Sequence, residues 1–409
     1  MNFKKFLAAT ALAFVMPCLA NAQEAEQAPK EEGWIFSNEV RLPITSIKNQ
    51  NAAGTCWCYS SLAFVEAELL RMGKGEYDFS EMFIVWNTYM DRAQATVRTH
   101  GDISFSQGGS FYDVLYGIKH YGLVPDSELP AGVKHGDVLS DFSEFSSVCD
   151  PFVAGITKNR KLQTNTEGTP LWREAMAGIL NAYIGERPET FVYNGKEYTP
   201  KSFAESTGFN ADDYVNLASF THHPFYEQFV IEVQDNWRWG TAYNLPIDEF
   251  MEVMNYAIDN GYTIAWGSDV SEKGWLRGDK AGIAVLPDLE AKANNDAGTD
   301  MARWIGLSAS DRAKEAYKQP TPQRIVSQED RQIAYDNYET GDDHGMLIYG
   351  KAQDQLGNNY FIVKNSWGDY GQYEGSLYAS EAFVRYKTMN IVVHKDALPK
   401  HIKKALGIK

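Results

Sequence analysis

Three short motifs from distant parts of the chain constrain the fold more than any other feature of this sequence. One holds Cys56, the second holds His344 and the third holds Asn365. A thiol, an imidazole and a side-chain amide are the parts of a cysteine-nucleophile acyl-transfer site, and they act only when they touch. We therefore expect a fold that brings the first part of the chain against its last third.

Cys56 is predicted to open a helix, because the loop-forming segment 52–55 gives way there to a helical pattern. A helix N-terminus offers unpaired N–H groups and a partial positive charge, and both favour thiolate over thiol. The alternative is a buried, inert cysteine, which is the commonest fate of a lone one. Cys58 points to a different face of the same helix and is predicted to be a core residue.

Gln50 precedes Cys56 by six residues. A side-chain amide held there can donate to an oxyanion together with the backbone N–H of Cys56. The alternative is a solvated loop glutamine, which would be the better interpretation of Gln50 taken alone.

The last third of the sequence predicts two strands, 345–350 and 360–364, joined by a turn-rich segment. If the turn centres on 354–355, antiparallel pairing places His344 directly opposite Asn365. This pairing favours a catalytic role for the histidine over the alternative of a strand-end residue satisfied by its neighbours.

The amide of Asn365 can accept a hydrogen bond from one ring nitrogen of His344 while the other nitrogen faces the thiol. Such a bond fixes the tautomer of the imidazole. Trp367 is predicted to shield that hydrogen bond from water.

Two other motifs have more open interpretations. Gly108 and Gly109 either let a substrate backbone approach closely, since glycine adds no side-chain bulk, or form the turn before a helix. The segment 222–224 (His-His-Pro) lacks a Cys/His pair or a glutamate at ligand spacing, so it is predicted to be a turn and no metal site is expected. No phosphate or dinucleotide motif occurs in a suitable context, and no cofactor is expected.

Periodicity also outlines the rest of the fold. No internal repeat or long linker occurs, so a second independent domain is not required. A short strand is expected at 41–47 and another at 262–266. Helices are expected from Cys56 to Gly73, from a cap at Ser80 to Met90, from about 111 to Gly122, and near 172–184 and 246–259.

Residues 1–22 have the pattern of an export signal. The apolar stretch 6–16 is too short to span a bilayer, and small residues precede a cleavage site between Ala22 and Gln23. Cys18 offers the alternative of a lipid-modified cysteine, which the preceding proline disfavours. We expect an exported protein, periplasmic or secreted.

A polar, acidic leader is expected at 23–39. Removing 1–22 takes away Lys4 and Lys5 and no acidic residue, so the formal net charge moves from −16 to −18. That charge repels nucleic acid and anionic lipid at long range, and neither nucleic acid nor a membrane is an expected partner of the mature chain. Three cysteines would remain, an odd count that leaves at least one thiol free.

Taken together, these motifs resemble those of the papain-like cysteine peptidases, and within them the bleomycin hydrolase and aminopeptidase C branch. The resemblance runs from about Arg41 to Val393, and its most specific pieces are 50–57, 342–345 and 365–368. It implies an α+β, papain-like two-subdomain fold, with a helical subdomain and a β-barrel-like sheet that enclose the site between them. The peptidase domain would span 40–396, with a helical insertion at about 130–250.

The resemblance also implies roles for single residues and for partners. Peptides would be the substrates, and a homo-oligomer is expected, a hexamer by analogy. The implied roles are nucleophile for Cys56, general base and acid for His344, orienting amide for Asn365, oxyanion donor for Gln50, and contact with the substrate backbone for Gly108 and Gly109.

The C-terminal segment leaves the mode of cleavage open. In the resembled branch an extended C-terminal tail enters the cleft and restricts action to free amino termini. Here 397–409 is a short, amphipathic, lysine-rich segment. An aminopeptidase is the favoured interpretation, an endopeptidase with the same residues is the alternative, and a non-catalytic binding protein of the same fold is a third.

Overall fold

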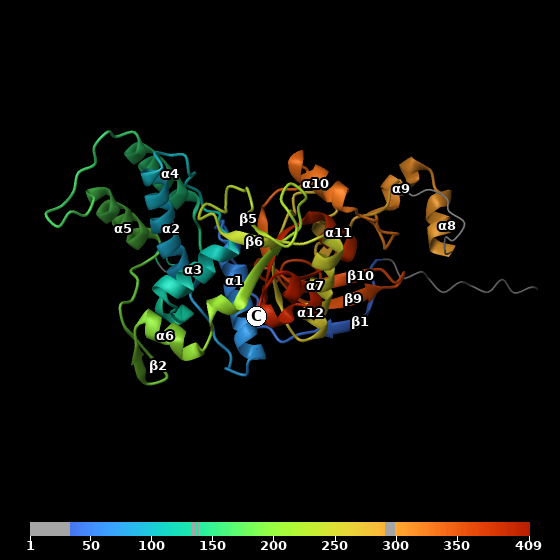
Figure 1. Ribbon diagram of the computed structural model, residues 1–409, viewed down its shortest axis with the longest axis horizontal. Coiled ribbons are helices and arrows are strands. Elements are labelled where there is room, and N and C mark those ends of the chain that lie inside the picture. Colours follow the sequence, from blue (N-terminus) through green and yellow to red (C-terminus); the bar gives the residue numbers. More distant parts are fainter. Residues whose placement is uncertain (1–32, 133, 135, 137–138, 291–298) are drawn as a thin grey trace, which may run out of the picture. The chain divides into compact units, whose positions relative to one another are not determined.

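The helices predicted for the first third of the chain are present in the computed structural model, which describes residues 33–132, 134, 136, 139–290 and 299–409 (Figure 1). Ser80 caps the second helix as predicted, since its side chain accepts from the backbone N–H of Phe83 at 3.1 Å. That helix continues past the predicted end at Met90 because its later turns bury Ala93 and Val97. The three helices are α1 (Cys56–Arg71), α2 (Glu81–Arg98) and α3 (Phe111–Tyr121).

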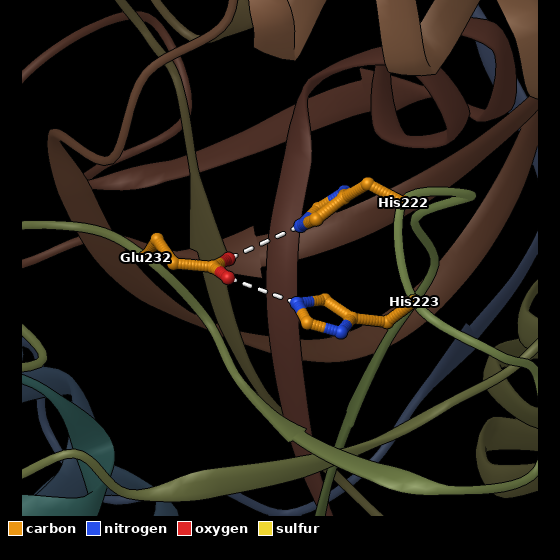
Figure 2. Close-up of side chains that lie close together, drawn as sticks. All are labelled: His222, His223 and Glu232. Carbon is orange, nitrogen blue, oxygen red and sulfur yellow. Dashed lines mark hydrogen bonds and ion pairs between the residues drawn. The ribbon is translucent and has the colours of Figure 1, made fainter.

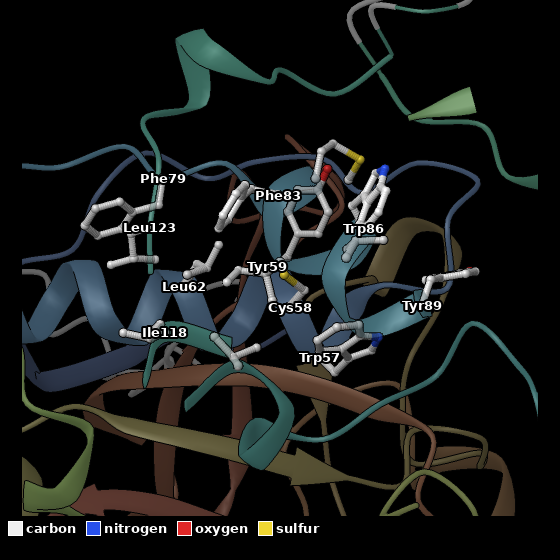
Figure 3. Close-up of a cluster of buried hydrophobic side chains, with 14 of the residues drawn as sticks. Trp57, Cys58, Tyr59, Leu62, Phe79, Phe83, Trp86, Tyr89, Ile118 and Leu123 are labelled. Carbon is white, nitrogen blue, oxygen red and sulfur yellow. The ribbon is translucent and has the colours of Figure 1, made fainter. Parts of the chain in front are cut away.

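These helices pack around one apolar cluster, part of which is drawn in Figure 3. Cys58, Tyr59 and Leu62 of α1 and Phe83 of α2 all belong to it. Cys58 is 0 % exposed, which confirms the prediction of a core residue. Three more helices complete the cluster: α4 (Ser143–Thr157), α5 (Leu171–Tyr183) and α6 (Pro200–Thr207).

A ten-stranded, mostly antiparallel sheet forms the other part of the fold. Its order is β5-β6-β4-β12-β7-β9-β10-β11-β8, with β1 pairing β9, and the pairs β4–β6 and β8–β11 are parallel. The strands are β1 (Phe36–Arg41), β4 (Tyr214–Ala218), β5 (Gln228–Val230), β6 (Thr241–Asn244), β7 (Ile264–Ser268), β8 (Ile283–Ala284), β9 (His344–Asp354), β10 (Asn359–Lys364), β11 (Ser376–Ser380) and β12 (Thr388–His394).

Strand β9 lies at the junction of the two parts. Its residues point alternately to the two faces of the sheet. Leu347 belongs to the helical cluster, whereas Met346 and Ile348 belong to a second cluster with α7 (Ile247–Asp259). The helical part and the sheet thus share β9, and the catalytic histidine predicted from the sequence is its first residue.

Two sequence predictions about the N-terminal part need correction. In the described part of the expected leader, 33–39, strand β1 begins at Phe36 and pairs with β9, and it ends at Arg41, where the strand 41–47 was expected to begin. Phe36 belongs to the folded part of the chain, because its ring stacks on that of Tyr378 with centroids 3.7 Å apart. The expected signal peptide, residues 1–22, lies outside the described residues.

The expected helical insertion at about 130–250 is only partly helical. Helices α4 to α6 occupy its first part, together with the hairpin β2 (Phe191–Tyr193) and β3 (Lys196–Tyr198). Its later part supplies β4, β5 and β6, and β4 pairs with β12 from the end of the chain. These short strands alternate apolar and polar residues over too few positions to show a clear period in the sequence.

The register of the β9–β10 hairpin also differs from the prediction. Asn359 faces Gln353, so the turn lies later than expected, and a bulge then shifts the register so that Lys364 faces Leu347. The carboxylate of Asp354 causes the delay, because it accepts from the N–H groups of Leu356 and Asn358 at 2.9 Å each. Asn365 is therefore not directly opposite His344.

The C-terminal segment belongs to the core of the sheet part. Leu398, Ile402 and Leu406 are 2 %, 0 % and 7 % exposed and lie in the second cluster with residues of α7. Their lysine neighbours face outward on α12 (Lys400–Ala405). The other helices are α8 (Thr299–Gly306), α9 (Ala309–Glu315), α10 (Gln328–Asp336) and α11 (Glu381–Lys387). Among the described residues, no helix combines the length and apolar character needed to cross a membrane.

Candidate active site

The thiol of Cys56 opens into a cleft between the helical part and the sheet. Cys56 is the first residue of α1, as predicted, and it is a free cysteine. The cleft has a volume of about 220 Å³ and is lined by Cys56 and Trp57, by Gly108 and Gly109, and by the segment 342–345 that holds His344. The motifs of Cys56 and His344 therefore meet at one cleft, and Asn365 of the third motif contacts His344.

His344 is held by Asn365 and covered by Trp367. The imidazole Nε2 lies 2.8 Å from Asn365 Oδ1, and the same oxygen accepts from the backbone N–H of Ser366 at 2.8 Å. That second bond turns the amide oxygen towards the ring, so Nε2 carries the hydrogen and Nδ1 is left as the basic nitrogen. The indole of Trp367 stacks on the imidazole with centroids 4.9 Å apart.

Gly345 lets α1 approach the start of β9, a role that the sequence did not reveal. A Cβ at this position would lie 2.7 Å from Ser60 Oγ and 3.4 Å from Trp57 Cα. A side chain would therefore push the first turn of α1 away from the strand. The close approach of the helix to the strand places Cys56 and His344 in the lining of one cleft.

Burial dominates the electrostatics of the thiol and the imidazole. It raises the pKa of Cys56 to about 11, against the smaller lowering by the backbone N–H groups of Gly345 and Trp57. Burial also lowers the pKa of His344 to about 4. The lowering effect of the helix N-terminus on the pKa of Cys56 is therefore smaller than the raising effect of burial.

Gln50 is fixed by three hydrogen bonds, and it is not among the described residues that line the cleft. Its backbone N–H donates to Ser366 O at 2.9 Å, its Oε1 accepts from Ser366 Oγ at 2.6 Å, and its Nε2 donates to Ala53 O at 2.8 Å. The residue is 7 % exposed, so it is not the solvated loop glutamine of the alternative. Ser366 orients the amide so that its nitrogen points towards the loop that precedes Cys56.

Gly108 and Gly109 both line the cleft, and neither position has room for a side chain. A Cβ on Gly108 would lie 2.0 Å from Asp235 Oδ2, and one on Gly109 would lie 2.8 Å from the Trp57 ring. The Trp57 indole N–H donates to Gln107 O at 3.0 Å, which ties this loop to the start of α1.

Replacing Gly108 with alanine should displace the Asp235 carboxylate and distort the cleft wall. We expect kcat/KM for peptide hydrolysis to fall by about a hundredfold, because misplacing cleft groups by an ångström has that order of effect. Gly155→Ala is the matched control, since no atom lies within 4 Å of its Cβ position. Wild-type kinetics in Gly108→Ala would show that the contact does not shape the cleft.

Three carboxylates at the cleft were not predicted to be functional. Asp343 has a structural contact, because its Oδ1 accepts from the N–H of Val270 at 2.9 Å. Asp342 and Asp235 also line the cleft, and no local motif marked Asp235. Only the folded chain places these two together.

The His-His-Pro segment is a turn as predicted, but Glu232 lies beside it (Figure 2). Its carboxylate is 3.1 Å from His222 Nε2 and 2.8 Å from His223 Nε2. The fold therefore brings a glutamate close to the two histidines, which the sequence spacing did not indicate. Gln332 donates to His222 Nδ1 at 3.0 Å, and its own Oε1 accepts from Thr221 N–H. The Nε2 of His222 therefore carries a hydrogen directed at Glu232, where a metal ligand would need a lone pair.

Known proteins with similar sequences are peptidases. The sequence model of the Peptidase C1-like family matches residues 295–408, a stretch that contains His344 and Asn365. Aminopeptidase G of Lactobacillus delbrueckii subsp. lactis is 22% identical over 90% of this chain and 84% of its own length. Aminopeptidase C of Streptococcus thermophilus is 22% identical over 93% of this chain and 86% of its own length.

A solved structure of PepW from Lactobacillus rhamnosis HN001 has a similar fold. It is 19% identical in sequence, with a TM-score of 0.65 over 91% of this chain and 84% of that one. This likeness shows the fold, and the sequence matches extend over nearly the whole chain. The chain has the α+β fold of the papain-like cysteine peptidases, and its sequence is similar to those of aminopeptidases C and G over most of its length.

Proposed function

We propose that this protein is an exported aminopeptidase that hydrolyses peptide bonds through an acyl-enzyme on Cys56. The observation that carries the proposal is the hydrogen bond of 2.8 Å between His344 Nε2 and Asn365 Oδ1, made at the edge of the cleft that Cys56 lines. That bond leaves Nδ1 as a base for the thiol. Export rests on the sequence pattern of residues 1–22 alone.

The first half of the reaction transfers an acyl group to sulfur. Burial disfavours a single charge on either group, but proton transfer from Sγ to the imidazole creates two opposite charges whose attraction offsets part of that cost. The thiolate attacks the substrate carbonyl, and the oxyanion accepts from the backbone N–H of Cys56 and the Gln50 amide. His344 then gives its proton to the leaving amine, and the C–N bond breaks.

The second half of the reaction releases the acyl group. Water enters where the amine left, and His344 Nδ1 takes one of its protons as the oxygen attacks the thioester. The C–S bond breaks, and the proton returns to sulfur. Asn365 keeps the ring oriented in both halves, and Trp367 keeps solvent from their hydrogen bond.

One observation favours the endopeptidase as the second candidate. Residues 397–409 pack into the sheet core, and none of these described residues lines the cleft. A tail that blocks the cleft, as the resemblance implies for aminopeptidases of this branch, is therefore not formed by this helix. Selectivity for free amino termini would have to come from the cleft walls.

A ladder experiment distinguishes the two candidates. We expect an unblocked ten-residue peptide to lose residues one at a time from its amino end, while its N-acetylated copy stays intact, as followed by mass spectrometry. Internal cuts in both peptides at similar rates would support the endopeptidase instead. Absence of any cleavage, with Cys56 unreactive towards iodoacetamide in folded protein, would refute peptidase function.

A further inference from the structure

Two carboxylates line the cleft, and no lysine or arginine is among the described residues that line it. Asp235 and Asp342 both line the cleft with Cys56 and His344. Their negative charges contribute, after burial, to raising the pKa of Cys56, so both lie within electrostatic reach of the sulfur. Carboxylates in this place oppose thiolate formation, and a cation bound beside them would offset that effect.

Asp235 is held in place from behind by a buried arginine. Arg92 of α2 is 1 % exposed, and its guanidinium lies 3.3 Å from Asp235 Oδ1 and donates to Gly108 O at 2.5 Å. The carboxylate consequently lies against the Cα of Gly108, since a Cβ there would be 2.0 Å from Oδ2. Its side chain keeps 29 % of its surface exposed. Arg92 thus fixes Asp235 and leaves part of the carboxylate accessible.

Asp342 has a different environment. Its carboxylate makes no hydrogen bond or ion pair with any residue in the described part of the chain, although its neighbour Asp343 accepts from Val270. Burial, with the charges of Asp235 and Asp343, raises the pKa of Asp342 to about 7. A carboxyl group that lies at a substrate cleft without a hydrogen-bond partner in the described part of the chain can accept from a donor on the ligand.

The chemistry of an exopeptidase supplies such a donor. In a peptide whose first residue is removed, the α-nitrogen is two bonds from the carbonyl carbon that sulfur attacks, about 2.5 Å away. A protonated α-amine therefore has to lie in the same cleft as the thiol, close to its wall. An ammonium group carries three donors and one positive charge, which matches two carboxylates.

We propose that Asp235 and Asp342 bind the protonated α-amine of the peptide substrate and so restrict this cleft to free amino termini. The inference rests on the proposed peptidase function and adds the groups that select the substrate. Asp235 also covers the Gly108 face, along which additional residues before the scissile bond would run. The bound ammonium offsets the charges that oppose the thiolate, so the substrate itself helps to activate Cys56.

The test compares three fluorogenic substrates that share one leaving group. These are the 7-amido-4-methylcoumarin derivatives of alanine, N-acetylalanine and N-acetyllysine. The first offers an α-ammonium, the second offers none, and the third offers only a side-chain ammonium. The proteins are wild type, Asp342→Asn, Asp342→Glu, Asp235→Asn and Asp369→Asn, an exposed carboxylate near the site that serves as the charge control.

We expect wild type and Asp369→Asn to prefer the free alanyl substrate strongly. In Asp342→Asn and Asp235→Asn the ratio of kcat/KM for free over acetylated alanine should fall by about tenfold to a hundredfold, the range for a lost charged hydrogen bond. The change should come mainly from KM, and Asp342→Glu should restore part of the ratio because it keeps the charge.

Three results would overturn the inference while leaving the peptidase intact. They are an equal loss on both alanyl substrates in the asparagine variants, an unchanged ratio, and a preference for N-acetyllysine that disappears in Asp342→Asn. If an asparagine variant does not fold, calorimetry on the inactive Cys56→Ala protein compares the affinity of a free peptide with that of its acetylated copy. Wild type that hydrolyses none of the three substrates would refute the proposed function itself.

Discussion

Replacing Cys56 with alanine should lower kcat for peptide hydrolysis by about 10⁴-fold to 10⁶-fold, the range measured when a nucleophile is removed from a catalytic unit. The acyl-enzyme cannot form without the sulfur, and binding plus oxyanion stabilisation are all that remain. Thermal unfolding should change little, because Cys56 is only partly buried at the cleft surface. Steady-state kinetics and a melting curve on the same preparation check both statements.

Cys149→Ala provides the matched control for that experiment. Cys149 is also a free thiol, but it is 0 % exposed in the helical cluster on α4. Its replacement should leave kcat unchanged and lower the melting temperature through a small cavity. If Cys149→Ala lost activity while Cys56→Ala kept it, the nucleophile would be wrongly assigned.

Replacing His344 with alanine should slow hydrolysis by about 10³-fold to 10⁴-fold, which is the upper part of the range that a general acid and base contributes to a rate. The variant should also acquire a steep pH dependence. Without the imidazole the thiol must ionise alone, and with a pKa of about 11 only about one molecule in 10⁴ is thiolate at pH 7. Because the deprotonated form reacts, the rate should rise about tenfold for each pH unit below that value.

Alkylation of Cys56 by iodoacetamide isolates this effect from the rest of the reaction. Peptide mapping between pH 6 and pH 9 should give a slope near one for His344→Ala and a shallower dependence for wild type, where the imidazole takes the proton. His120→Ala, an exposed histidine on α3, should behave as wild type. Equal alkylation rates at pH 7 in His344→Ala and wild type would mean that the imidazole does not activate the thiol.

The hairpin illustrates what sequence reasoning can and cannot provide. The two strands and the proximity of His344 to Asn365 were predicted, and the side chains do form a hydrogen bond of 2.8 Å. The predicted register was nevertheless wrong, since Asp354 organises a later turn and a bulge follows. The amide of Asn365 reaches the ring from beyond the end of β10. The predicted contact is therefore present, although the predicted cross-strand pairing was wrong.

The environment of the thiol shows a second limit. A helix that begins at Cys56 was predictable from local sequence, and so was its effect on the charge of the sulfur. Burial depends on what the rest of the chain places over the site. That burial raises the pKa of Cys56 more than the neighbouring N–H groups lower it.

Taken alone, the sequence predicted the candidate reacting groups and the helices around them, because residue type and short-range periodicity are local properties of the chain. The tertiary structure decided the close approach at Gly345, the burial of residues 398–406 in the sheet core, and the meeting of Asp235 with Asp342 in the cleft. These features join residues from separate elements, and their geometry follows from packing that no single segment encodes.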